Sequence, residues 1–203
     1  MTGKASTTGV VNMTESADTS AGLANALPEV AVLGGGCFWC TESVFAALKG
    51  VLSVVPGYAG GHVQNPSYEQ VCNKDTGHVE VVKVTFDPTQ ISFESLLHVF
   101  FATHDPTTLN RQGADVGPQY ASAIFYQSDA QQQVARHVMQ QVEQALEQPV
   151  VTQLRANETF WEAESYHHDY YARNPNQGYC AYVIAPKMQK LRKLFAPYLK
   201  TVL

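Results

Sequence analysis

The sequence predicts an α+β fold, in which a mixed, largely antiparallel sheet carries packed helices. Two observations lead to this class: apolar segments typical of strands occur in both halves of the chain, and segments with a helical period separate and follow them. The chain has 203 residues, 45% hydrophobic and 15% charged, which suits one globular domain. We therefore expect one folded domain over residues 28–203. Residues 1–27 lack periodicity and are expected to form a disordered extension.

The first expected elements surround a short run of glycines. Residues 30–33 are apolar and indicate a buried strand, and residues 38–49 indicate a helix that ends at Gly50. Residues 51–55 indicate a second strand. Residues 56–68 contain Pro, Gly and Asn in a pattern typical of a long loop, and a long loop inside a compact domain is usually functional.

A clear strand is predicted over residues 78–86, between a glycine and an Asp-Pro pair. Alternation along this strand places Glu80 on one face with Val82, Val84 and Phe86. A carboxylate with apolar neighbours is partly desolvated, so we expect the pKa of Glu80 to be raised. The alternative is a solvated position on an edge strand, but the apolar residues on the same face as Glu80 argue against it. A raised pKa is what a proton donor needs at neutral pH.

The rest of the chain continues with helices, loops and strands. The expected elements are a helix over residues 92–103, a polar loop over 105–119, a strand over 120–126, a helix over 128–147, a strand over 150–154, a helix over 163–171, a turn over 174–179 and a helix over 186–195. Valines at i+4 spacing in the helix over 128–147 mark a face that packs in the core.

Composition and charge exclude several classes of function. The net charge of −5 and the pI near 5.8, without a cluster of Lys and Arg, argue against a nucleic-acid-binding protein. No apolar run is long enough to span a membrane, and the N-terminus lacks the apolar segment of a secretory signal, so we expect a cytoplasmic location. Four cysteines do not make a disulfide scaffold and favour a thiol-based function.

The most informative residue is Cys37, which lies between the glycine run and the first helix. The glycines permit a tight strand-to-helix turn, so Cys37 is expected at or near the helix N-terminus. Unpaired N–H groups and the helix dipole favour a negative charge there, and we expect a lowered thiol pKa. Because the thiolate is the reactive form, Cys37 is predicted to be a nucleophile.

Other interpretations of the cysteines remain open. Cys37 and Cys40 form a CxxC pattern, which also occurs in half of a zinc site and in thioredoxin-like redox pairs. Zinc would need a second pair of ligands, but Cys72 and Cys180 are isolated in the sequence. Cys180 follows a turn-rich segment, where a thiol on a flexible chain could swing to meet another sulfur.

Two histidine patterns suggest metal chemistry only weakly. His78-Val79-Glu80 resembles part of the zinc deaminase signature, but its order relative to the CxxC pattern is reversed. The pair His167-His168, close to Glu164, matches no strong ligand spacing, and a solvated helix face is the expected position. We therefore predict no metal site.

Several separate motifs, in the correct order, resemble those of the A-type peptide methionine sulfoxide reductases. They lie between about residues 30 and 185 and are Gly36-Cys37-Phe38-Trp39 with Glu42, Gly57-Tyr58-Ala59-Gly60-Gly61, Asn65-Pro66-Ser67-Tyr68, Thr76-Gly77-His78-Val79-Glu80, His104-Asp105-Pro106-Thr107, residues 110–120, Asn174-Pro175 and Gly178-Tyr179-Cys180. The resemblance implies a ferredoxin-like plait and a single catalytic reductase domain over residues 28–203. It also implies reduction of methionine-(S)-sulfoxide, free or in proteins, as a repair of oxidative damage.

The resemblance implies a role for each residue at the reacting oxygen. Cys37 would attack the sulfoxide sulfur and become a sulfenic acid. Glu80 would give a proton to the sulfoxide oxygen. Tyr68 and Tyr120 would donate hydrogen bonds to the same oxygen and stabilise the developing charge.

Further roles implied by the resemblance concern substrate binding. Phe38 and Trp39 would form an apolar pocket for the S-methyl group of the substrate. Asp115 and Asn110 would lie near the site as orienting polar groups.

Regeneration would need a second thiol and an external reductant. The resemblance implies that the Cys180 thiol condenses with the sulfenic acid to form a disulfide, and that thioredoxin reduces this disulfide. The family needs no metal or organic cofactor, and we expect a monomer that binds no nucleic acid and no membrane. The chain departs from the family pattern at two positions. Many family members have glycine at the position of Cys40 and usually have arginine at the position of Ala121. Cys40 is therefore either a competing resolving thiol or a bystander.

Two rival functions use the same residues. A general disulfide oxidoreductase would work with Cys37 and Cys40 and would reduce insulin. A redox-sensing or binding module would recognise oxidised methionine without turnover.

Overall fold

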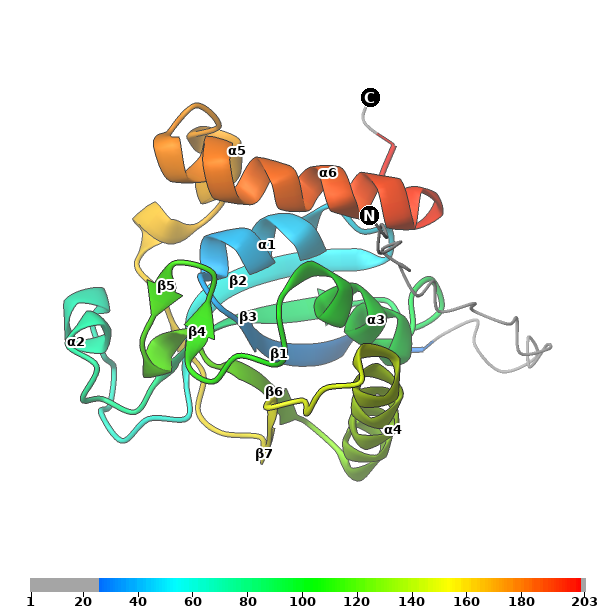
Figure 1. Ribbon diagram of the computed structural model, residues 1–203, viewed down its shortest axis with the longest axis horizontal. Coiled ribbons are helices and arrows are strands. Elements are labelled where there is room, and N and C mark those ends of the chain that lie inside the picture. Colours follow the sequence, from blue (N-terminus) through cyan, green and yellow to red (C-terminus); the bar gives the residue numbers. More distant parts are fainter. Residues whose placement is uncertain (1–25, 202–203) are drawn as a thin grey trace, which may run out of the picture.

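The structure is a computed structural model that describes residues 26–201, so most of the predicted extension 1–27 lies outside the described residues. Its centre is a six-stranded sheet in the order β7-β6-β1-β3-β2-β8 (Figure 1). Its strands are β1 Glu29–Gly35, β2 Val51–Ala59, β3 Val79–Phe86, β6 Ser122–Tyr126, β7 Gln153–Ala156 and β8 Trp161–Glu162. All neighbouring strands are antiparallel except β6 and β7, which are parallel. The expected α+β class with a mixed, largely antiparallel sheet is confirmed.

Helices cover the sheet mainly on one side. They are α1 Phe38–Ala46, α2 Tyr68–Cys72, α3 Phe93–Thr103, α4 Asp129–Leu146, α5 Tyr170–Arg173 and α6 Ala185–Phe195. Figure 1 shows α6 lying over α1, which in turn lies over the sheet. A turn of π-helix, Cys180–Ile184, leads directly into α6, and a small ribbon of β4 Arg111–Gln112 and β5 Asp115–Val116 stands at one end of the molecule.

The two central strands are buried on both faces, which explains their apolar sequences. The larger core cluster lies between the sheet and the helices and includes Leu33, Val82, Phe45 and Phe100. A smaller cluster on the opposite face includes Val32, Ala59, Val79, Val81 and Phe125. Because Glu80 is in phase with Val82, its side chain is directed to the helix-covered face, as the alternation predicts.

Strand β2 extends further than the sequence predicts. Residues 56–59 were expected in a loop, but they continue the strand and pair with both β3 and β8. The carbonyl of Pro56 accepts a hydrogen bond from Ala163 N at 2.9 Å. A Cβ at Gly57 would lie 2.4 Å from the ring of Phe160, so glycine permits this close pairing rather than breaking the strand.

A short helix is also missing from the sequence prediction. Residues 65–68 were expected to continue a loop, yet Ser67 caps helix α2. Its hydroxyl accepts from Gln70 N, and the Gln70 side chain accepts from Ser67 N, which is a capping box. The cap fixes Tyr68 at the first position of the helix.

Three other boundaries differ from expectation. Strand β6 begins at Ser122, because Tyr120 belongs to a 3-10 turn over Pro118–Tyr120. Strand β7 lies two to three residues later than the predicted strand over 150–154. The predicted helix over 163–171 is wrong: this segment holds a 3-10 turn, Ser165–His167, and only the start of α5.

Candidate active site

Cys37 is the cap residue of α1, as the sequence predicts. Its carbonyl accepts hydrogen bonds from the backbone N–H groups of Cys40, at 3.1 Å, and Thr41, at 3.4 Å. The preceding Gly36 has a φ of +86°, and a Cβ there would lie 2.5 Å from the Gln112 side chain. Only glycine satisfies both the left-handed backbone and the close approach, so the turn fixes the position of the Cys37 thiol.

Glu80 lies directly beside the start of this helix. Its side chain is 1% exposed, and its Oε2 accepts a hydrogen bond from Phe38 N at 3.0 Å. Burial raises the pKa of Glu80 to about 8, and the nearby charges of Asp115 and Cys40 act in the same direction. The expected raised pKa is confirmed, and Glu80 is mostly protonated at neutral pH.

A cavity of about 180 Å³ joins Cys37 and Glu80. It is lined by Cys37, Phe38, Trp39, Tyr68, Glu80, Asp115, Tyr120 and Tyr179. These residues come from the start of α1, the start of α2, β3, β5, a 3-10 turn and the segment before the π-helix. Seven of them are the residues that the sequence singled out, so the fold gathers them from distant parts of the chain.

The two predicted tyrosines remain hydrogen-bond donors in this cavity. Desolvation raises the pKa of both Tyr68 and Tyr120, and the neighbouring Glu80 charge raises it further. Both phenols therefore keep their protons over the ordinary pH range. They can donate to an oxygen atom bound between them.

Asn110 and Cys180 are predicted site residues that do not line this cavity. Asn110 has a φ of +51°, and its carbonyl accepts a hydrogen bond from Gly117 N at 2.9 Å, so its backbone shapes the loop that carries Asp115. Cys180 is fully buried in the larger core cluster at the start of the π-helix. The expectation that Cys180 lies on a flexible turn is therefore wrong for this state of the protein.

The two thiols of the CxxC pattern have opposite pKa shifts. Burial raises the pKa of Cys37 well above its ordinary value, and the interaction with Cys40 and the Glu80 charge add to the effect. The interaction with Cys37 and the charge of Lys187 lower the pKa of Cys40 to about 7, against the effect of burial. The expected lowered pKa of Cys37 is wrong, because desolvation outweighs the helix terminus. The two sulfurs interact directly, so the pair titrates as a unit in which the charge favours Cys40.

The sequence missed two residues, one that lines the cavity and one that contacts its lining. Tyr179 donates a hydrogen bond to Asp115 Oδ2 at 2.6 Å, and its hydroxyl lies 3.7 Å from Cys40 Sγ. Tyr179 belongs to the motif Gly178-Tyr179-Cys180, and only its position next to Cys180 could have indicated a role at the site. His167 is 1% exposed and accepts a hydrogen bond from Trp39 Nε1 at 3.0 Å, so its expected solvated position is wrong. No periodicity in that segment indicates its burial.

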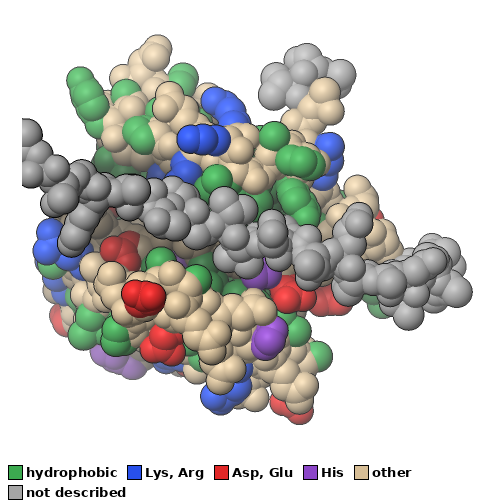
Figure 2. Space-filling view, turned by 45° about the vertical axis from the view of Figure 1, so that its right-hand side comes forward, with side chains coloured by type: hydrophobic (Ala, Val, Ile, Leu, Met, Phe, Trp, Pro, Cys, Tyr) green, Lys and Arg blue, Asp and Glu red, His purple; other side chains and the backbone are tan. Residues whose placement is uncertain are grey.

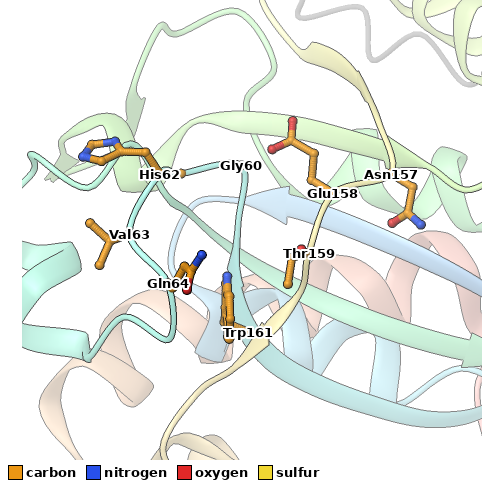
Figure 3. A pocket seen from close by; sticks show the side chains of 9 residues that line it. Gly60, His62, Val63, Gln64, Asn157, Glu158, Thr159 and Trp161 are labelled. Atoms are coloured by element: carbon orange, nitrogen blue, oxygen red, sulfur yellow. The ribbon is translucent and has the colours of Figure 1, made fainter.

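A larger hollow lies elsewhere, between the loop after β2 and the segment that joins β7 to β8 (Figure 3). It has a volume of about 660 Å³, and its lining includes His62, Gln64, Glu158 and Trp161 but no cysteine. None of the residues singled out in the sequence as site residues belongs to it. This hollow therefore offers no thiol, in contrast to the smaller cavity that Cys37 lines.

Two further properties concern metals and membranes. Within residues 26–201, no group of three or more His, Cys, Asp or Glu side chains is arranged to hold a metal ion. Over the same range, no helix combines the length and the apolar character that crossing a membrane requires.

Charge is unevenly distributed over the face in Figure 2. Several basic side chains lie in the upper part of this view, and others lie at its left edge and bottom, where most of the visible acidic side chains also lie. The charge of Lys187, near the start of α6, lowers the pKa of Cys40.

A family model described as peptide methionine sulfoxide reductase matches residues 29–198, which is nearly the whole described domain. The chain belongs to this family. A peptide methionine sulfoxide reductase MsrA from Saccharolobus solfataricus is 54% identical over 172 residues, covering 85% of this chain and 97% of that protein. Family membership makes the chain an oxidoreductase that acts on methionine sulfoxide.

Solved structures of the same family have the same fold. Reduced Mxr1 from Saccharomyces cerevisiae matches with a TM-score of 0.70 and 32% identity, covering 75% of this chain and 89% of that one. Methionine sulfoxide reductase A from Corynebacterium diphtheriae matches with a TM-score of 0.69 and 33% identity, covering 78% and 80%.

Proposed function

We propose that the protein reduces methionine-(S)-sulfoxide, free or within a polypeptide, with Cys37 as the nucleophile. The observation that carries this proposal is the cavity that Cys37 shares with the buried, protonated Glu80. A nucleophilic sulfur and a proton donor are the two groups that transfer of an oxygen atom from the sulfoxide requires. Oxidised proteins and free methionine sulfoxide would both be substrates.

In the first step, Cys37 passes its proton to the neighbouring Cys40 thiolate, whose pKa is about 7. The resulting Cys37 thiolate attacks the sulfoxide sulfur while Glu80 gives its proton to the sulfoxide oxygen. Tyr68 and Tyr120 donate hydrogen bonds to this oxygen as negative charge develops on it. The oxygen stays with Cys37, which becomes a sulfenic acid, and the substrate leaves as the thioether methionine. The sulfoxide gains two electrons, the thiolate loses two, and Glu80 is left as a carboxylate.

The aromatic side chains at the start of α1 would bind the methyl group. Phe38 is fully buried against Tyr58, with ring centroids 5.8 Å apart. The indole of Trp39 stacks on Tyr170 at a centroid distance of 3.6 Å and an interplanar angle of 4°. Two fixed aromatic surfaces favour a small apolar group over a charged one. Asp115 would orient the substrate, and Asn110 would act through the loop conformation.

In the regenerating steps, the Cys180 thiol condenses with the sulfenic acid to a disulfide and releases water. Thioredoxin then reduces this disulfide by thiol exchange. Cys40 is the second candidate for the resolving thiol, because it interacts directly with Cys37 and has a pKa of about 7. The cycle uses external thiols as its reductant and no bound cofactor.

The proposed activity is tested with dithiothreitol and the separated sulfoxide epimers. Methionine should form from the S epimer and not from the R epimer. Failure to form methionine would remove the reductase proposal, and reduction of insulin would then support the disulfide oxidoreductase. Stoichiometric binding of the sulfoxide without turnover would support the binding module instead. Mass spectrometry after one turnover identifies which sulfurs are joined.

We also propose the ferredoxin-like plait as the fold, with a monomer in the cytoplasm as the working form. Support for the plait comes from the strand order β6-β1-β3-β2 and from α1 and α3 as the two helical connections. The proposed cycle needs thiols that a reducing compartment maintains. Size-exclusion chromatography with light scattering tests the monomer.

A further inference from the structure

We propose that His167 is a positioning residue for the sulfoxide methyl group, because its imidazole fixes the indole plane of Trp39. This inference rests on the proposed function, in which Trp39 forms one wall of the methyl pocket. His167 does not line the cavity itself. It acts from behind the wall, through a hydrogen bond and through ring contacts.

The hydrogen bond defines the tautomer of His167. An indole N–H is only a donor, so Nδ1 of His167 must carry a lone pair to accept it at 3.0 Å. The proton of the neutral ring therefore lies on Nε2. Desolvation lowers the pKa of His167 to about 4, so the ring keeps this accepting form at neutral pH.

The other nitrogen of His167 has an unusual environment. The Nε2 atom is buried and has no hydrogen-bond partner among the described residues, while Glu164 Oε2 lies 3.8 Å away. A carboxylate at this distance favours the tautomer with the proton on Nε2, which is the one that Trp39 requires. The acceptor role of Nδ1 leaves the proton on Nε2, which lies near this carboxylate but beyond hydrogen-bond distance.

Glu164 is itself held by hydrogen bonds from two tyrosine residues. Its Oε1 accepts from Tyr68 N at 2.8 Å, and its Oε2 accepts from Tyr58 Oη at 2.9 Å. The His167 ring also contacts Phe38 and Tyr68, with centroid distances of 4.8 and 4.6 Å. The segment from Glu164 to His167 thus connects the methyl-binding wall to the tyrosine proposed to bind the oxygen.

The first test compares two substitutions in assays with methionine-(S)-sulfoxide and dithiothreitol. His167→Phe keeps a ring of similar size but removes the acceptor, and we expect KM to rise about three- to tenfold, the size of one lost hydrogen bond, with kcat nearly unchanged. His167→Asn offers an amide oxygen near the position of Nδ1 and should restore KM to within about twofold of the parent protein. Equal KM values for the parent and His167→Phe would overturn the inference.

A double-substitution cycle separates positioning from bulk. Trp39→Phe removes the indole N–H, so adding His167→Phe should raise KM by less than about twofold further. The same fold increase in both backgrounds would show that His167 acts only through packing, and the inference would fail.

An NMR measurement tests the contact without any activity. The sequence has two tryptophans, and the indole N–H signal that disappears in Trp39→Phe belongs to Trp39. This signal should move upfield and exchange faster with water in His167→Phe, but not in His167→Asn. A signal unchanged in His167→Phe would overturn the inference. If the parent protein shows this contact but reduces no sulfoxide, the proposed function fails while the contact stands.

Discussion

Cys37 and Cys180, the two thiols assigned to successive steps, lie in very different environments. Cys37 lines a cavity at the start of α1, beside a protonated carboxyl group. Cys180 is fully buried in the core at the start of a π-helix and does not reach this cavity. The groups proposed for reduction already line one cavity, whereas the proposed regeneration through Cys180 would need the segment before α6 to rearrange.

The contacts around Cys180 indicate what must change. Its neighbour Tyr179 donates a hydrogen bond to Asp115, and Ile184 at the other end of the π-helix is fully buried. A π-helix is a less favourable form than an α-helix and often occurs at functional positions. Unwinding this turn would release the thiol while α6 keeps its place on α1. The following predictions test this contrast between a preformed site and a segment that must move.

The largest effect is expected for Cys37→Ser. Without the nucleophile, reduction of the sulfoxide should fall on the order of 10⁴-fold or more, as in other enzymes that lose a covalent nucleophile. Single-turnover assays of methionine release measure this loss. Cys180→Ser is the matched control and should keep a normal first turnover. A Cys37→Ser protein that still releases one equivalent of methionine would contradict the preformed site.

Glu80→Gln should have the next largest effect, because an amide cannot supply the proton. General acid catalysis contributes about 10²- to 10⁴-fold, so the single-turnover rate should fall within this range. In the parent protein the acid form is the active one, so the rate should decline as pH rises through about 8. Rapid-quench assays across pH should show that Glu80→Gln lacks this decline. An identical alkaline limb in both proteins would assign it to another group.

Cys180→Ser should affect only the second half of the cycle. Methionine release should stop after one equivalent when thioredoxin is the reductant, because the sulfenic acid has lost its proposed partner. Quantification of methionine against enzyme concentration measures this stoichiometry. Cys40→Ser is the comparison. If Cys40→Ser stops after one equivalent while Cys180→Ser continues, the resolving thiol is Cys40 and no large rearrangement is needed.

The smallest expected effect is that of Tyr179→Phe. This substitution removes the hydrogen bond to Asp115, which contributes about 0.5–3 kcal/mol, and so loosens the segment that holds Cys180. Disulfide formation after a single turnover should become faster, by about two- to tenfold. Stopped-flow fluorescence and thiol trapping measure this rate. A slower rate would indicate that Tyr179 guides Cys180 rather than restrains it.

Periodicity predicted the parts of the fold that are regular and long. The strand over 78–86 and the helices over 92–103 and 128–147 are present with boundaries shifted by one residue, because each has a clear apolar pattern. The short elements were missed because one or two long-range contacts decide them. Pro56 stays in a strand since its carbonyl has a partner in Ala163, which no local pattern indicates.

The candidate site could be predicted as a set of residues but not as an electrostatic environment. The alternation around Glu80 correctly gave a raised pKa, since burial of a strand residue follows from its own neighbours. The pKa of Cys37 could not be obtained in this way, because its burial comes from residues far along the chain, among them Tyr179. His167 was missed for the same reason: its partner Trp39 is 128 positions away.

The hydrogen bond from Phe38 N to Glu80 Oε2 has a consequence for the direction of proton delivery. An oxygen that accepts from a backbone N–H keeps its lone pairs, so the acidic hydrogen resides on Oε1. The two oxygens of this carboxyl group are therefore inequivalent in every cycle. In the proposed reaction, each new substrate would meet a donor whose geometry is already set, and reprotonation would return to the same atom without rotation of the side chain.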